Sequence, residues 1–179
     1  MTATLTVARP ASDEYFEYYG KYIGLVPDED ALVPLRDQLE DTLALLRPLD
    51  EKKSKHRYAP DKWSVKEVLG HLSDCERIFA YRALRIGRGD TTPIEGFDEN
   101  AYIPPAHFDD RPLDDLIEDY ERVRDATLSL FNGLDEEALL RRGTANDKTV
   151  SVRAIGWIIA GHELHHRGIL IERYGLGKK

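Results

Sequence analysis

Four segments of this chain repeat apolar residues at steps of three and four, which is the period of an amphipathic helix. Stretches that contain proline or glycine separate them. Each segment must bury one apolar stripe, and four such stripes in one small chain predict an all-α four-helix bundle. The expected helices run from about 29 to 47, from 64 to 87 or 89, from 112 to about 131, and from 151 to 174.

Residues at the ends of two segments predict where those helices begin and end. Ser64 and Glu67 have the spacing of a capping box, in which each side chain accepts a hydrogen bond from the other residue's backbone N–H. Ser151 stands at the N-cap position of the last segment, and Gly175 follows that segment as a C-cap. These signals define the starts of the second and fourth helices more sharply than those of the other two.

A long connection, 88–109, joins the second and third helices with the sequence RGDTTPIEGFDENAYIPPAHFD. It holds three prolines and no helical period, so we expect a loop. A loop of this length in a compact domain is often functional, and this one could carry the chain back across the bundle in a crossover. After the third helix we expect a short helical turn at 135–142, followed by a turn and an extended segment at 143–152.

The length of 179 residues suits one domain with a substantial core rather than two. We therefore expect 1–179 to be a single helical domain, with 1–28 as an N-terminal arm. The arm is rich in tyrosine and would pack either on the body or on a partner, because tyrosine is favoured at protein interfaces.

Charge and cysteine content exclude several classes of partner and compartment. The net charge is −8 and no basic stripe is present, so a nucleic-acid partner is not expected. Cys75 is the single cysteine, which rules out an internal disulfide and fits a reducing compartment. No apolar run has the length of a signal peptide or a membrane span, so we expect a cytoplasmic protein without a membrane partner.

Three of the six histidines lie in the sequence HELHH near the C-terminus. His162 and His166 are four residues apart, so a helix places both on one face, and that face is the apolar stripe. Two imidazoles so placed can bind one metal ion. A metal site with open positions commonly uses three protein ligands. His71 is the best third candidate, because it borders the apolar face of the second helix.

Core packing is the alternative interpretation, since a histidine on a buried face is usually a packed residue with a hydrogen-bond partner. Burying two imidazoles without partners is costly, however, and a metal ion would satisfy both, so we favour the metal. His165 points about 100° away from His166 and is interpreted as a residue behind the ligands or at the surface. His56 and His107 lie in expected loops and are interpreted as surface residues.

The residues His162, Glu163 and His166 also match the H-E-x-x-H pattern of zinc metalloproteases, whose glutamate is a general base. Those enzymes take a third ligand downstream, where this chain offers only Glu172 on the same helix, so we do not favour a protease. Glu163 nevertheless remains a candidate catalytic base, although we prefer the alternative that its side chain is a solvated residue on the helix surface.

Several other polar residues have two interpretations. Asp74, the second catalytic candidate, could orient His71 from one turn away or could be a surface acid near Arg77. Cys75 could be a soft metal ligand, although a small core residue is the more common role. The stretch 98–100 could cap a pocket, although its residues are also ordinary turn formers.

Three stretches together resemble the DinB/YfiT-like metal-binding proteins: KWSVKEVLGHLSDCERIFAYRALR, FDENAY and SVRAIGWIIAGHELHHRGILIERY. They occur in order and cover nearly the whole chain. The resemblance implies a four-helix bundle with a crossover, which often dimerises, and a metal held by three histidines. Carried over to this sequence, those histidines are His71, His162 and His166, the same three that the helical pattern selects.

The resemblance also implies a function. Relatives include enzymes that transfer a bacillithiol- or mycothiol-type thiol to an electrophile, or that isomerise maleylpyruvate. We therefore expect a homodimer that binds one divalent ion (Zn, Ni, Mn or Fe) and a small-molecule substrate, with a low-molecular-weight thiol as co-substrate. A metal-dependent hydrolase and a non-enzymatic metal-binding stress or scaffold protein are the alternatives. An open metal position favours an enzyme, whereas a fourth protein ligand favours the structural role.

Overall fold

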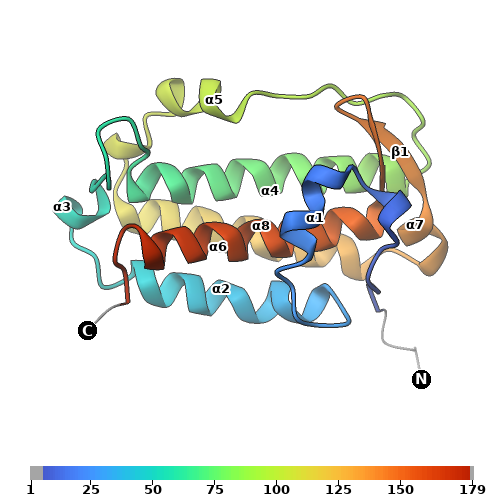
Figure 1. Cartoon of the computed structure of the whole chain (residues 1–179), viewed down its shortest axis with the longest axis horizontal. Helices are drawn as coiled ribbons and strands as arrows, with labels where there is room; N and C mark the ends of the chain where they lie inside the picture. The colour runs from blue at the N-terminus through green and yellow to red at the C-terminus, as the bar shows by residue number, and fades with distance from the viewer. Residues whose placement is uncertain (1–5, 178–179) are drawn as a thin grey trace.

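Four long helices form the body of the computed structural model, which describes residues 6–177 (Figure 1). These are α2 (Leu32–Leu46), α4 (Val65–Gly87), α6 (Leu113–Asn132) and α8 (Val152–Glu172). Helix α4 packs between α6 and α8, and α2 closes the other side of both. The predicted four-helix bundle is confirmed, with helix bounds within about three residues of those expected.

The two N-cap signals in the sequence operate as predicted, whereas α8 ends at the C-cap residue Arg173, two residues before the expected Gly175. The Ser64 hydroxyl accepts a hydrogen bond from the Glu67 N–H, and the Glu67 carboxylate accepts one from the Ser64 N–H. The Ser151 hydroxyl accepts a hydrogen bond from Ala154 N–H at the start of α8. These bonds satisfy backbone donors that have no partner in the first turn of a helix.

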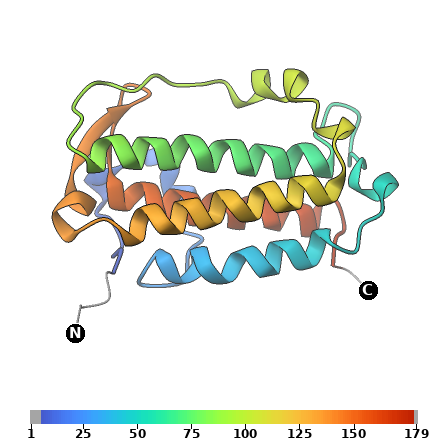
Figure 2. The same cartoon turned by 180° about the vertical axis from the view of Figure 1, so that it is seen from behind.

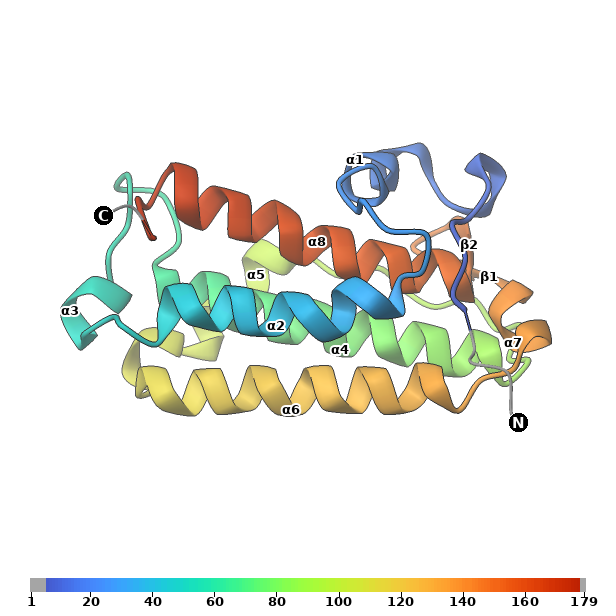
Figure 3. The same cartoon turned by 90° about the horizontal axis from the view of Figure 1, so that it is seen from below.

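The crossover that the sequence suggested is present. The connection after α4 runs back along the whole length of the bundle before α6 begins (Figures 1 and 2). As a result α4 and α6 run in the same direction, whereas α2 and α8 run the opposite way (Figure 3). A short connection would have forced α4 and α6 to be antiparallel.

The expectation of a purely irregular connection is wrong, because it contains the helix α5 (Glu99–Ala106) and the 3₁₀ turn η3 (Phe108–Asp110). The Asp98 carboxylate caps α5 by accepting hydrogen bonds from two backbone N–H groups. Pro104 and Pro105 cannot donate backbone hydrogen bonds to the carbonyls four residues before them, so they weaken the last turn of this helix, which stops before the left-handed residue His107.

Smaller elements fill the ends of the bundle. The extended segment predicted around 143–152 is a hairpin, in which β1 (Arg142–Ala145) pairs with β2 (Lys148–Ser151) through a turn of two positive-φ residues, Asn146 and Asp147. Ile94 of the connection donates its N–H to the carbonyl of Thr144 in β1 and accepts a hydrogen bond from the N–H of Asn146. The remaining short elements are η1 (Ser12–Glu14), η2 (Glu17–Tyr19), α1 (Gly20–Ile23), α3 (Glu51–Ser54) and α7 (Glu136–Leu140).

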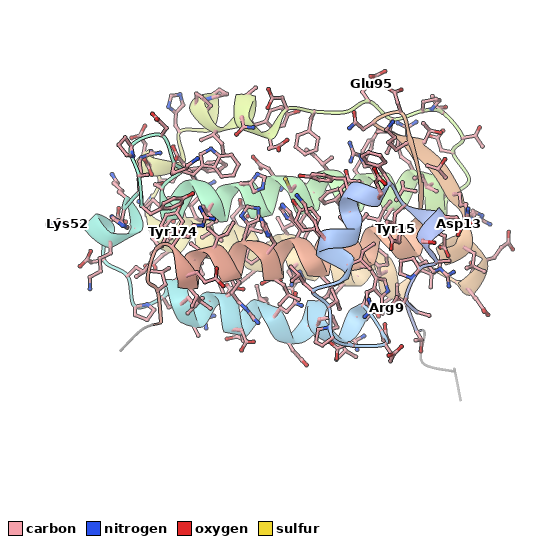
Figure 4. The ribbon with its side chains drawn as sticks, in the orientation of Figure 1. Arg9, Asp13, Tyr15, Lys52, Glu95 and Tyr174 are labelled. Carbon is pink, nitrogen blue, oxygen red and sulfur yellow. The ribbon has the colours of Figure 1, made fainter. Side chains whose placement is uncertain are left out.

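The N-terminal arm packs on the body at the hairpin end of the bundle, where Arg9, Asp13 and Tyr15 lie in Figure 4. Trp157 of α8 donates its indole N–H to the carbonyl of Val7 at 2.8 Å, and the Arg9 guanidinium lies 4.2 Å from the Trp157 ring centre. The first five residues of the predicted arm lie outside the described residues. Over residues 6–177, no helix combines the length and the apolar character of a membrane span.

Candidate metal centre

The three histidines selected from the sequence meet between α4 and α8. His71 comes from α4, and His162 and His166 come from successive turns of α8. The Nε2 atoms of His71 and His162 are 3.2 Å apart, and one nitrogen from each of the three rings lies within 4.8 Å of the others. Helical periodicity brings the α8 pair together, and the antiparallel packing of α4 on α8 adds His71.

Burial keeps these imidazoles in the neutral form. His71 and His162 are 6% and 7% exposed, and His166 is partly buried. Burial, followed by the positive charge of His165, lowers the pKa of His71 to about 4. The pKa values of His162 and His166 are also lowered well below the ordinary value, again chiefly by burial and then by neighbouring histidines. A neutral imidazole has the free lone pair that a metal ligand requires.

The donor set fits a divalent metal ion. Two ligand nitrogens that each lie 2.0–2.1 Å from a tetrahedral ion are about 3.3 Å apart, close to the 3.2 Å between His71 Nε2 and His162 Nε2. Among the described residues, no fourth histidine, cysteine, aspartate or glutamate joins the group. An ion held by three imidazoles would therefore keep coordination positions open toward the adjoining cavity.

Cys75 contacts His71 but does not join the group of three ligand nitrogens. Its Sγ is 3.5 Å from His71 Nδ1 and 3.7 Å from His71 Nε2, the ring nitrogen that faces His162. Burial, and after it the carboxylates of Glu99 and Asp74, raises the pKa of the Cys75 thiol to about 12. The residue is thus a buried thiol that contacts His71 and stays protonated at neutral pH.

Asp74 does not contact His71. Its carboxylate accepts a hydrogen bond from Arg77 at 3.3 Å on the outer side of α4, as the surface interpretation of this residue expected. The group that contacts His71 Nδ1 is instead Cys75, which the sequence offered only as a soft ligand or a core residue.

Glu163 is neither solvated nor in the cavity, so the solvated interpretation that we preferred is wrong. The side chain is 1% exposed, accepts a hydrogen bond from the Thr42 hydroxyl at 2.6 Å, and pairs with Arg124 at 2.8 Å. Arg124 also holds Glu76 through two hydrogen bonds. Successive residues on a helix point about 100° apart, so Glu163 faces α2 and α6 while His162 faces α4.

A cavity of about 480 Å³ adjoins the histidines, which line it together with Cys75 and His165. The rest of its wall comes from the arm, the residue just before the N-cap of α4, the second half of α4, the connection and the hairpin. Those lining residues are Phe16, Tyr18, Tyr19, Lys21, Tyr22, Trp63, Phe79, Arg82, Phe97, Glu99, Ala145, Asn146 and Lys148. The other two histidines, His56 and His107, are exposed and do not line the cavity, as the sequence suggested.

The arm forms part of the cavity wall, which sequence reasoning missed. The Tyr22 ring lies edge-on to His162 and His165, with centres 5.4 and 5.3 Å away. Gly161 makes this approach possible, because a Cβ at that position would collide with the backbone carbonyl of Tyr22. A glycine in the middle of an apolar helix is the sequence signal that could have indicated the contact.

Comparison with known proteins links the chain to one family and to two solved structures. A family model described as the DinB superfamily matches residues 35–170. No curated protein matches the sequence significantly. YfiT from Bacillus subtilis, described as a probable metal-dependent hydrolase with an unusual four-helix bundle topology, is 17% identical, with a TM-score of 0.68 and 93% of each chain covered.

The second structure is a mycothiol-dependent maleylpyruvate isomerase, which is 16% identical with a TM-score of 0.69. The match covers 87% of this chain and 63% of the isomerase. At these levels of identity both likenesses concern the fold, and they agree with the bundle and crossover described above.

Proposed function

This chain belongs to the DinB superfamily, and from that premise we propose that His71, His162 and His166 hold one divalent metal ion in an enzyme. We further propose that the enzyme transfers a low-molecular-weight thiol to an electrophilic small molecule. The observation that carries the proposal is the group of three neutral imidazoles, without a fourth side-chain ligand among the described residues, beside a cavity large enough for a small substrate.

The chemistry that the ion would supply is a lowered pKa for a bound thiol or water, which yields a nucleophile at neutral pH. The protein's own thiol does not fill this role, since Cys75 is buried and its pKa is raised to about 12. A thiol-dependent reaction in this cavity therefore needs an external thiol. The structural likeness to a mycothiol-dependent isomerase supports the same choice.

The positions of the carboxylates favour thiol transfer over hydrolysis. Hydrolysis of an amide by a metal site commonly uses a nearby carboxylate as general base. Glu163 is held by Arg124 and Thr42 on another face of α8, and Asp74 is held by Arg77. A thiol has a pKa of about 8.5, far below that of water, so an ion here would convert a bound thiol to thiolate at neutral pH with less need of such a base.

Hydrolysis of a small substrate is the second candidate, and one observation favours it. Glu99 is a carboxylate among the residues that line the cavity, and it is partly exposed there. It could accept a proton from a water molecule. The structural likeness to YfiT, described as a probable metal-dependent hydrolase, is consistent with this alternative.

Metal content measured by mass spectrometry tests the site. Tag-free wild type, His162→Ala and the control His107→Asn would be compared after loading with Zn, Ni or Mn. Asparagine tolerates the left-handed backbone of residue 107, so the control should fold. We expect one ion per chain in the wild type and the control and none in His162→Ala. An absence of metal in all three would overturn the proposal.

Activity assays then separate the two reactions. The loaded protein would be given a chlorodinitrobenzene electrophile with cysteine, bacillithiol or mycothiol, and separately a nitrophenyl ester without thiol. Thiol transfer predicts metal-dependent loss of free thiol and no ester hydrolysis. Metal-dependent ester hydrolysis without thiol transfer would instead favour the hydrolase.

A further inference from the structure

Arg82 is a buried cation in the cavity wall that has no acidic partner. Arg82 is 4% exposed to solvent, and its guanidinium forms no ion pair with any described residue. One guanidinium nitrogen donates a hydrogen bond to the carbonyl of Glu95 at 3.2 Å, and Nε is buried without any partner. Burying a charge without a counter-ion is costly, so an unpaired guanidinium at a cavity indicates a missing anion.

The cavity as a whole carries an excess of positive charge. Lys21 and Lys148 line it with Arg82, and Glu99 is the single carboxylate among the lining residues. Neither lysine forms an ion pair with a described residue: Lys21 lies 3.7 Å from the Tyr18 ring centre, and Lys148 lies 5.0 Å from that of Phe16. This excess stands out in a chain whose net charge is −8.

Arg82 lies on the same face of α4 as the candidate ligand His71. It follows His71 by eleven residues on α4, a spacing that returns to the same face after three turns. The Phe79 ring is near both groups, with its centre 6.1 Å from the His162 ring centre and 5.7 Å from the Arg82 guanidinium carbon. Phe97 of the connection lies 5.7 Å from the same carbon. The guanidinium therefore lies near two aromatic rings, and one of these rings is also near His162.

We propose that Arg82 binds a carboxylate of the substrate, with Lys21 and Lys148 adding positive charge at the cavity wall. The free edge of a guanidinium matches a planar carboxylate through two parallel hydrogen bonds, and the flanking phenyl rings suit an apolar or aromatic body. The substrate is thereby assigned to the class of small carboxylic acids. This assignment rests on the proposed function only for the reaction at the three histidines.

Calorimetric titration with a matched pair of probes tests the assignment. The probes are 3-phenylpropanoate and its neutral analogue 3-phenylpropanamide, titrated into protein freed of metal with EDTA. We expect the acid to bind wild type at least tenfold more tightly than the amide. Arg82→Gln should bind the acid no better than the amide, since glutamine keeps a donor for Glu95 but carries no charge.

Arg85→Gln is the matched control, because Arg85 lies one turn further along α4, pairs with Asp90 and does not line the cavity. It should bind the acid as the wild type does. Equal affinity for acid and amide in the wild type, or unchanged affinity for the acid in Arg82→Gln, would overturn the proposal. The comparison in the wild type needs no variant, so it holds even if Arg82→Gln does not fold.

The titrations test the carboxylate site independently of the metal centre. All titrations are made without metal, so failure of the three histidines to bind an ion leaves the result interpretable. Conversely, a protein that binds metal but shows no preference for the acid would lose the carboxylate assignment and keep the metal centre.

Discussion

Arg124 and Glu163 form an ion pair at 2.8 Å in the interior of the protein. The Arg124 side chain is 0% exposed to solvent, and the Glu163 side chain is 1% exposed. Arg124 comes from α6, binds Glu76 of α4 and donates a hydrogen bond to the carbonyl of Leu35 of α2 at 2.9 Å, so the guanidinium joins all four long helices at the centre of the bundle. The glutamate that matches a protease motif in the sequence is thus part of the internal support of the fold.

Replacing Glu163 with glutamine should lower stability and leave the metal centre intact. Loss of one charge from a buried network that Arg124 still shares with Glu76 should cost about 1–3 kcal/mol. Urea unfolding measures this cost, and mass spectrometry measures the metal. A variant of unchanged stability that lost its catalytic rate a hundredfold would instead point to a general base.

Two glycines of α8 should respond oppositely to alanine. At Gly168 nothing lies within 4 Å of the added Cβ, so Gly168→Ala should stabilise the helix by about 0.5–1 kcal/mol. At Gly161 the Cβ would collide with the Tyr22 carbonyl, so Gly161→Ala should displace the arm and cost about 1–3 kcal/mol. Urea unfolding of both variants checks the sign, and equal effects would contradict the packing of the arm.

Acid should weaken the attachment of the arm through Glu14. Burial raises the pKa of this carboxyl, but hydrogen bonds from Arg153, Ala11 and Ser151 lower it more, to about 2 from an ordinary 4.5. A lowered pKa in the folded state gives stability that is present above about pH 5 and is lost as the pH falls toward 2.

Urea unfolding between pH 7 and pH 3 measures this effect in wild type and Glu14→Gln. The variant should be less stable at pH 7, and the difference should shrink steadily below pH 5. A difference that does not change with pH would show that the carboxylate charge contributes nothing.

The Cys75 thiol should be unreactive in the native protein. Because burial raises its pKa to about 12, the thiolate fraction at pH 8 is negligible, and the sulfur is also shielded from solvent. Ellman's reagent should react with EDTA-treated protein only on the time scale of unfolding, and rapidly in urea. Fast reaction of the native protein would contradict the burial of this residue and the conclusion that an external thiol is needed.

Metal binding should raise the melting temperature. At a free metal concentration a hundredfold above Kd, a ligand that binds only the folded state contributes about 2.7 kcal/mol, or roughly 5–10 °C for a chain of this size. Differential scanning calorimetry with and without EDTA tests this in wild type and His166→Ala. The variant should show no metal-dependent shift, and a full shift in it would place the ion elsewhere.

The amino-acid sequence by itself determined the features that depend on local spacing. The helical period predicted the four long helices, and the capping residues Ser64 and Ser151 set the starts of α4 and α8. The spacing of His162 and His166 put both on one helix face, and the length of the connection allowed the crossover. Each of these follows from the geometry of a single helix or segment, which is the same wherever that segment packs.

Only the tertiary structure decided what surrounds the histidines. Lys21, Arg82 and Lys148 line one cavity although they lie on the arm, α4 and the hairpin. Glu163 was assigned to solvent because no local rule shows that α6 brings Arg124 against it. The charge and shape of the cavity therefore emerge only when the crossover and the arm close over α4 and α8, since contacts between distant segments depend on how the helices pack and not on their own periods.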